Sequence, residues 1–144
     1  MAAFMYRYAG SPAVKLPAKS PFTDVTPSNT NFYKEIIWMN QQGISTGWAV
    51  GGGKKEFRPK DEITRDAMAA FMYRFADKPA FKAPSTSPFV DVPKTSQFYK
   101  EITWLSSAGI STGWTQSKGK PQYRPYDEIS REAMAAFMYR LNRL

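Results

Sequence analysis

The chain has 144 residues and a formal net charge of +8, and it contains neither cysteine nor histidine. The lack of cysteine excludes disulfides and thiolate metal sites, and the lack of histidine removes the commonest acid–base catalyst and the commonest metal ligand. With 42% hydrophobic and 15% aromatic residues, the chain can still form a packed core. No apolar run reaches the roughly 18–20 residues that a membrane span requires, so we expect no membrane insertion.

The first 20 residues predict the end of a helix and a linker. Residues 1–10 read as the last turns of a helix, because Gly10-Ser11-Pro12 follows an apolar helical pattern. Residues 11–20 hold prolines and small or basic residues, which predicts an extended linker.

The segment Phe22-Thr23-Asp24-Val25 alternates apolar and polar residues. It predicts a short extended segment that turns Phe22 and Val25 inward. We expect Asp24, and Asp91 in the second copy, to accept hydrogen bonds from nearby backbone N–H groups, with a direct ligand contact as the alternative.

A first helix is predicted over about residues 31–42, with Thr30 or Asn31 as its cap. We expect its two tryptophan positions, Trp38 and Trp104 in the second copy, to lie in the core or in a groove wall. The predicted apolar face comprises Phe32, Ile36 and Met39.

The sequence Gly-Ile-Ser-Thr-Gly-Trp follows at residues 43–48 and again at 109–114. Gly47 and Gly113 are expected to need a positive φ or a close backbone approach. Residues 49–56, with three consecutive glycines, predict a mobile loop, and they lack the residue order of a phosphate-binding loop.

A second helix is predicted from the N-caps Thr64 and Ser130 onward, with Asp66 and Glu132 in its first turn. The helix is apolar on nearly every side, so neighbouring repeats must cover it.

These elements recur with a period of 66 residues. Residues 32–48 match 98–114 at 12 of 17 positions, and residues 57–74 match 123–140 at 14 of 18. We therefore divide the chain into the C-terminal helix of a preceding repeat and two whole repeats, in the order 1–10 helix, 11–20 linker, 21–76 repeat, 77–87 linker and 88–144 repeat. Because Met1 falls where each repeat already has a methionine, we expect the chain to be cut from a longer array.

The repeated motifs resemble the S-layer homology (SLH) repeat of bacterial cell-surface proteins. The resemblance rests on Phe-x-Asp-Val, the Gly-Ile-x-x-Gly-aromatic turn, Phe-Arg-Pro, and the Ile-Thr-Arg that opens the second helix. The segments Phe-Tyr-Lys-Glu-Ile and Gly-Ile-Ser-Thr-Gly-Trp are similar to the variant found in surface and wall-lytic proteins of high-GC Gram-positive bacteria. The family's Thr-Arg-Ala-Glu motif maps onto residues 64–67 and 130–133, with the Arg kept and Ala67 and Ala133 in place of the Glu.

The resemblance implies an all-α fold of tandem helix–loop–helix repeats that pack around a central helical bundle, with the third repeat incomplete. It implies a non-catalytic module, outside the cell or at its surface, that anchors a protein to an anionic secondary wall polysaccharide or to peptidoglycan through grooves between repeats. We expect no cofactor and no metal, since cysteine and histidine are both absent. The resemblance also implies a homo-oligomer or further repeats to complete the bundle.

Candidate ligand-binding residues follow from side-chain chemistry. Arg65 and Arg131 stand at helix N1, where the helix dipole disfavours a cation, and a guanidinium suits a carboxylate; the alternative is a structural ion pair with an aspartate. The tryptophans after the paired-glycine turns are candidate sugar platforms, with simple packing as the alternative. The candidates are Arg65, Arg131, Trp48, Trp114, Gly47, Gly113, Arg58, Arg124, Asp24 and Asp91.

Other function classes have less support. A glycosidase needs two carboxylates in different environments, and no distinctive pair is visible. The charge would permit a nucleic-acid partner, but no groove-reading motif is present, so we expect none. A structural module that self-assembles through its apolar helices, without a glycan ligand, is the alternative function.

Overall fold

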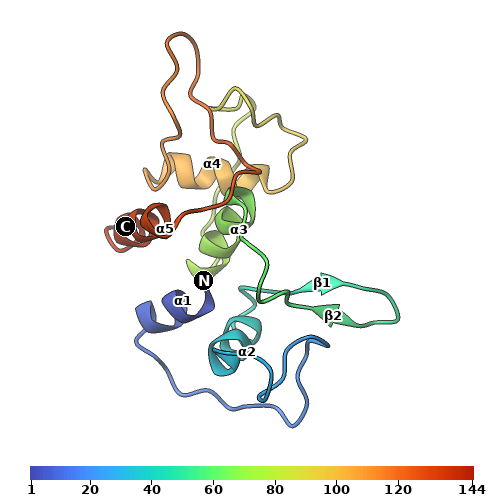
Figure 1. The fold of residues 1–144 in the computed structure, drawn as a ribbon. Coiled ribbons are helices and arrows are strands. Elements are labelled where there is room, and N and C mark those ends of the chain that lie inside the picture. The colour runs from blue at the N-terminus through green and yellow to red at the C-terminus, as the bar shows by residue number, and fades with distance from the viewer. The chain divides into compact units, whose positions relative to one another are not determined.

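A computed structural model describes all residues 1–144 (Figure 1). The chain divides into two compact units, residues 1–61 and residues 62–144. The helices are α1 Ala2–Tyr8, α2 Tyr33–Gln41, α3 Arg65–Phe75, α4 Tyr99–Ser107 and α5 Arg131–Leu141, and the strands are β1 Trp48–Ala49 and β2 Lys55–Glu56. None of these helices has both the length and the apolar character that a membrane span requires.

The predicted fold class, all-α around a central helical bundle, is wrong. The five helices hold only about a third of the residues. β1 and β2 form an antiparallel hairpin in which Trp48 lies opposite Glu56. This hairpin occupies the segment predicted as a mobile loop, because three consecutive glycines with positive φ reverse the chain between the strands.

The first unit is built on the packing of α1 against α2 (Figure 1). The Tyr6 and Trp38 rings meet edge to face, with centroids 5.5 Å apart. The Tyr6 hydroxyl donates to the Pro12 carbonyl over 2.6 Å and so ties the linker to α1. Met5 and Met39, which neighbour Tyr6 and Trp38 in the sequence, are fully buried.

The second unit repeats the arrangement with α3 against α4. The Tyr73 and Trp104 rings meet edge to face at 5.3 Å, and the Tyr73 hydroxyl donates to the Pro79 carbonyl over 2.8 Å. Trp38 and Trp104 therefore lie in the core, as predicted. Each unit pairs the second helix of one sequence repeat with the first helix of the next, so the compact units are offset from the repeats by one helix.

The predicted caps of α2 are wrong. Phe32 occupies the N-cap position with φ of +61° and gives no side-chain cap, and Phe98 does the same at α4 with φ of +60°. The polar residues before α2 serve a separate turn, in which the Asn29 carboxamide oxygen accepts from the Thr26 N–H at 2.8 Å. Phe32 is 54% exposed and leaves the predicted apolar face, whereas Ile36 and Met39 are buried.

The predicted N-caps of α3 and α5 are confirmed as Thr64 and Ser130. The Ser130 hydroxyl accepts from the Ala133 N–H, whereas Thr64 makes no side-chain cap bond. Seven of the eleven residues of α3 are buried, but only four of the eleven in α5. The predicted burial of the second helix on nearly every side is thus largely met by α3 but not by α5, although the two sequences are nearly identical.

Candidate functional site

Two aspartates hold the segment between the hairpin and the second helix of each repeat. The Asp24 carboxylate accepts from the N–H groups of Phe57 and Arg58, at 2.8 and 2.7 Å. Asp91 accepts from Tyr123 and Arg124 at the same two distances. The predicted role as acceptors from backbone N–H groups is confirmed, but the donors are not nearby in the sequence, since they lie more than 30 residues away. The bonds hold Arg58 and Arg124 at φ of +58°, a conformation that few non-glycine residues adopt.

The first unit carries an exposed tryptophan beside an arginine. Trp48, in β1, is 57% exposed, and the Arg58 guanidinium lies 5.2 Å from its ring centroid. Arg58 also forms an ion pair with Glu56, with Nε 3.2 Å from the carboxylate. The first unit thus presents an indole surface whose neighbouring cation is already neutralised by a carboxylate.

The second unit carries the equivalent pair with a different charge. Trp114 is 40% exposed, and the Arg124 guanidinium lies 4.6 Å from its ring centroid. Here Arg124 Nε donates to the neutral Gln122 carboxamide at 3.3 Å, in place of the Glu56 carboxylate of the first unit. This pair therefore keeps its positive charge.

The paired-glycine turns bring each tryptophan into place. Gly47 and Gly113 both have φ of +72°, and a Cβ atom at Gly113 would lie 2.5 Å from the Gln122 carbonyl oxygen and 2.8 Å from the Phe89 ring. A Cβ at Gly47 would meet the Phe22 ring and the Glu56 carbonyl in the same way. Both parts of the prediction, a positive φ and a close approach, are confirmed.

Arg65 lies inside the second unit with only 4% of its surface exposed. Its Nε donates to the Tyr123 carbonyl at 2.9 Å, and one terminal nitrogen lies 3.4 Å from the Ser111 hydroxyl. The guanidinium stacks on three aromatic rings, at 4.3 Å from Trp114, 4.9 Å from Tyr123 and 5.4 Å from Phe137. Its partners are a carbonyl, a hydroxyl and aromatic faces, so the predicted alternative of an ion pair with an aspartate is not what holds it.

Burial shifts the pKa values of Arg65 and Tyr123 in opposite directions. Burial lowers the pKa of Arg65, although the side chain stays charged at neutral pH. Burial also raises the pKa of Tyr123, whose hydroxyl donates to the Arg65 carbonyl at 2.9 Å. The reciprocal bonds between Arg65 and Tyr123 fix the start of α3 against the Tyr123 segment.

Main-chain hydrogen bonds also join the start of α3 to residues 125–129. Together with the bonds between Arg65 and Tyr123 they form what we call the clasp. The N–H groups of Arg65 and Asp66 donate to the Asp127 and Pro125 carbonyls at 2.9 and 3.0 Å, and the Ile129 N–H donates to the Ile63 carbonyl at 2.9 Å. The first free N–H groups of a helix form an anion site, but at α3 they are occupied by the protein's own carbonyls.

Arg131 holds the same motif position at the start of α5 but is exposed and makes no hydrogen bond, ion pair or ring contact. The same Ile-(Thr/Ser)-Arg sequence is therefore enclosed at α3 and open at α5. A direct ligand contact stays a prediction for Arg65, Arg131, Asp24, Asp91, Gly47 and Gly113.

The clasp also brings two acidic side chains together. The Glu62 carboxyl, through a hydrogen bond and charge repulsion, raises the pKa of Glu128. A carboxyl whose pKa is raised by folding binds its proton more tightly in the folded state, so stability is lost as the pH rises through that pKa.

We expect Glu128→Gln to raise the melting temperature at pH 7, because it removes the repulsion. The gain should shrink at acidic pH, where protonation of Glu128 removes the repulsion. Thermal unfolding followed by circular dichroism at neutral and acidic pH measures this. Glu62→Gln should give the same gain and the double substitution little more; additive gains would contradict a single repulsive pair.

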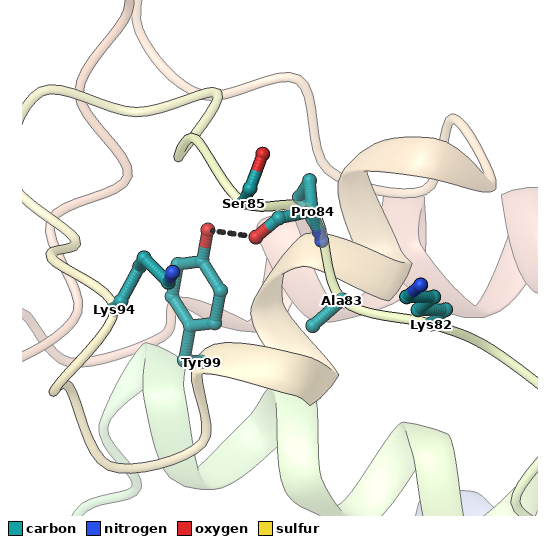
Figure 2. Close-up of a pocket in the computed structure, with 6 residues that line it drawn as sticks. All are labelled: Lys82, Ala83, Pro84, Ser85, Lys94 and Tyr99. Atoms are coloured by element: carbon teal, nitrogen blue, oxygen red, sulfur yellow. Dashed lines mark hydrogen bonds between the residues drawn. The ribbon is translucent and has the colours of Figure 1, made fainter.

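Sequence reasoning did not identify an open pocket of about 540 Å³ in the second unit (Figure 2). Its lining includes Lys82 and Lys94, and the Tyr99 hydroxyl donates across it to the Pro84 carbonyl at 3.0 Å. In the first unit Lys15 corresponds to Lys82, but residues 26–31, which correspond to the segment around Lys94, contain no lysine. A lysine in each of two loop segments was the available signal, but nothing in the sequence indicated that the segments meet.

The partners of Arg65 were also missed. The repeated Ser45 and Ser111 of the Gly-Ile-Ser turn were a signal, but only the fold joins the turn to a helix start 46 residues away. No group of three or more acidic side chains is placed to hold a metal ion.

Comparison with known proteins gives one family. The model of the S-layer homology domain matches residues 21–69 and 88–135, about two thirds of the chain. A search of curated proteins finds no match. Domains of this family are binding modules of cell-surface proteins, which anchor to the cell wall or surface and typically bind cell-wall polymers. Both matched segments contain the Asp-clamped, tryptophan-bearing arrangement described above, and the chain belongs to the S-layer homology domain family.

Proposed function

We propose that the chain is a non-catalytic module that binds an anionic secondary wall polysaccharide, or peptidoglycan, and so holds an attached protein at the surface of a Gram-positive cell. The observation that carries the proposal is the exposed tryptophan with an adjacent arginine, which occurs once in each unit. An indole face packs against a sugar ring, and a guanidinium binds a carboxylate substituent of an acidic sugar.

The two pairs suit different parts of such a polymer. Trp48 is the more exposed ring, and its arginine is paired with Glu56, so it suits a neutral sugar. Arg124 faces a neutral Gln122, and the buried Arg65 adds a second cation beside Trp114, so this pair suits an acidic sugar. The two lysines of the pocket in Figure 2 add further positive charge to the second unit.

Sedimentation with purified wall sacculi tests this proposal. We expect the protein to pellet with intact sacculi and to lose most of its binding once the secondary polymer is stripped. Binding that survives stripping would identify peptidoglycan as the ligand. Failure to bind either material would contradict wall binding and favour the alternative, a self-assembling structural module.

Substitution of the exposed tryptophans tests the sites. Trp48→Ala and Trp114→Ala should each lower the affinity for sacculi by about three- to tenfold, the effect of losing about 1 kcal/mol of aromatic packing. Raised salt should weaken the binding of the Trp48→Ala variant most, because the remaining pair is cationic.

Tyr126→Ala is the matched control, because Tyr126 is an exposed aromatic residue of the second unit without a neighbouring arginine in ring contact. Equal losses for Tyr126→Ala and Trp114→Ala would show that the tryptophan sites are assigned wrongly.

A homo-oligomer is a further part of the proposal. Its support is the contrast between the enclosed start of α3 and the open start of α5.

A further inference from the structure

The pocket shown in Figure 2 lies wholly within the second unit. Its walls come from residues 82–85, from Lys94, and from Tyr99 at the start of α4. The Tyr99 hydroxyl donates to the Pro84 carbonyl at 3.0 Å and so ties the first of these segments to the helix. The pocket is therefore held by a hydrogen bond between parts of the chain that lie 15 residues apart.

The pocket presents two lysines whose charge no carboxylate neutralises. In Figure 2 Lys82 and Lys94 flank Tyr99, and neither ammonium group forms an ion pair or a hydrogen bond with the protein. Neither wall segment, 82–85 or 94–99, contains an aspartate or a glutamate. A hollow lined by one sign of charge attracts ions of the opposite sign, so the pocket attracts anions.

The position of Lys94 is set by a turn that both units share. A hydrogen bond of 2.9 Å between the main-chain groups of its end residues closes the turn 93–96, and one of 3.3 Å closes the turn 26–29. Lys94 is the second residue of its turn, where the first unit has Pro27. Proline is favoured at this position, so the backbone of the turn does not require a lysine there.

The pocket is larger than a simple anion needs. Its volume of about 540 Å³ lies within the roughly 300–1,000 Å³ of small-molecule sites. Ser85 adds a hydroxyl that has no partner in the protein, and the first unit has Ala18 in its place. The pocket thus has room for an anion together with the sugar ring that carries it, and a hydroxyl to bond with either.

We propose that this pocket binds the phosphate group of a sugar phosphate. A lysine ammonium binds phosphate as a point charge, and the pocket contains two lysines and no arginine. A phosphate monoester carries close to two negative charges at neutral pH and so matches two lysines, whereas a carboxylate carries one. The pocket therefore differs from the Trp114–Arg124 pair, which suits a carboxylate. Only the source of the ligand, a phosphate-bearing sugar of a wall polymer, rests on the proposed function.

Titration of the full chain with glucose 1-phosphate, followed by amide chemical shifts in NMR spectra, tests this proposal. We expect the signals of residues 82–85 and 94–99 to shift and those of their counterparts 15–18 and 27–33 to stay in place. Glucuronic acid, which has one charge, should bind about two- to fivefold more weakly, and glucose should not bind. Inorganic phosphate, which lacks the ring, should also bind more weakly than glucose 1-phosphate.

The pH dependence separates phosphate from carboxylate. Binding of glucose 1-phosphate should weaken between about pH 7.5 and about pH 5, because the phosphate gains a proton with a pKa near 6. Binding of glucuronic acid should stay nearly constant over this interval, since a carboxylate stays ionised there and the chain contains no histidine.

Substitution of the lysines tests the site itself. Lys82→Gln and Lys94→Gln should each raise the Kd for glucose 1-phosphate about two- to fivefold, the effect of losing one exposed charge pair. Lys118→Gln is the matched control, because it removes the same charge from an exposed lysine of the second unit that does not line the pocket. It should leave the Kd unchanged.

Four results would overturn the proposal. One is a titration in which the signals of the pocket residues do not shift. Another is equal affinity for glucuronic acid and glucose 1-phosphate, and a third is equal affinity for inorganic phosphate. The fourth is an equal effect of Lys118→Gln and Lys94→Gln, which would reveal general attraction to a basic protein. None of these results depends on wall binding, which the sacculus experiment measures separately.

Discussion

Arg65→Ala is expected to lower the free energy of unfolding of the second unit by about 3–5 kcal/mol. The substitution removes contacts with three aromatic rings, each worth roughly 0.5–2 kcal/mol, and a hydrogen bond worth about 1 kcal/mol. It also leaves the buried Tyr123 carbonyl without a donor and opens a cavity. Urea unfolding followed by tryptophan fluorescence measures the loss.

Arg131→Ala is the matched control, because it makes the same chemical change at the same motif position on an exposed helix start. In dilute, monomeric protein it should change the free energy of unfolding by less than about 0.5 kcal/mol. Equal effects of the two substitutions would show that the enclosure of Arg65 does not stabilise the unit. The contrast also means that lost wall binding in an Arg65→Ala protein would report unfolding before it reported a lost ligand contact.

Gly113→Ala is expected to cost about 3 kcal/mol. An alanine at φ of +72° is strained by about 1 kcal/mol. Its Cβ would also meet the Gln122 carbonyl at 2.5 Å and the Phe89 ring at 2.8 Å, and relieving such overlap costs roughly 1–3 kcal/mol more. The movement would displace Trp114, so affinity for sacculi should fall together with the free energy of unfolding.

Gly119→Ala separates the cost of backbone strain from the cost of steric overlap. Gly119 has φ of +84°, but a Cβ there would meet nothing within 4 Å. This variant should lose only about 1 kcal/mol and should keep its binding. If both glycine variants lose the same free energy of unfolding, the close approach at Gly113 contributes nothing.

The sequence alone determined the repeats, the second-helix N-caps, the requirement for glycine at Gly47 and Gly113, and the backbone-binding role of Asp24 and Asp91. The N-caps and glycines follow from local backbone conformation, and the repeats follow from motifs that recur in the chain, so residue type and spacing carry them. The acceptor role of Asp24 and Asp91 was predicted from residue type, but their donors, more than 30 residues away, were not. The sequence placed Trp38 and Trp104 in the core or in a groove wall, and the structure shows both buried in the core.

The hairpin and the left-handed start of α2 were not determined in this way. Two-residue strands have too little periodicity to distinguish them from a loop, and Phe32 takes a positive φ that its residue type disfavours. The all-α class came from the family resemblance, and the strands were missed because the glycine-rich segment was read as a loop between helices.

Only the tertiary structure decided that Arg65 is buried and Arg131 is exposed. The two residues share a motif, a helix position and a charge, so no sequence rule separates them. The difference arises because the segment from Tyr123 to Ile129 folds back over the start of α3 and supplies carbonyls and ring faces 58 or more residues away, whereas no segment of the second unit does so for α5. Burial of a cation depends on what surrounds it in space, and those surroundings are set by contacts between distant parts of the chain.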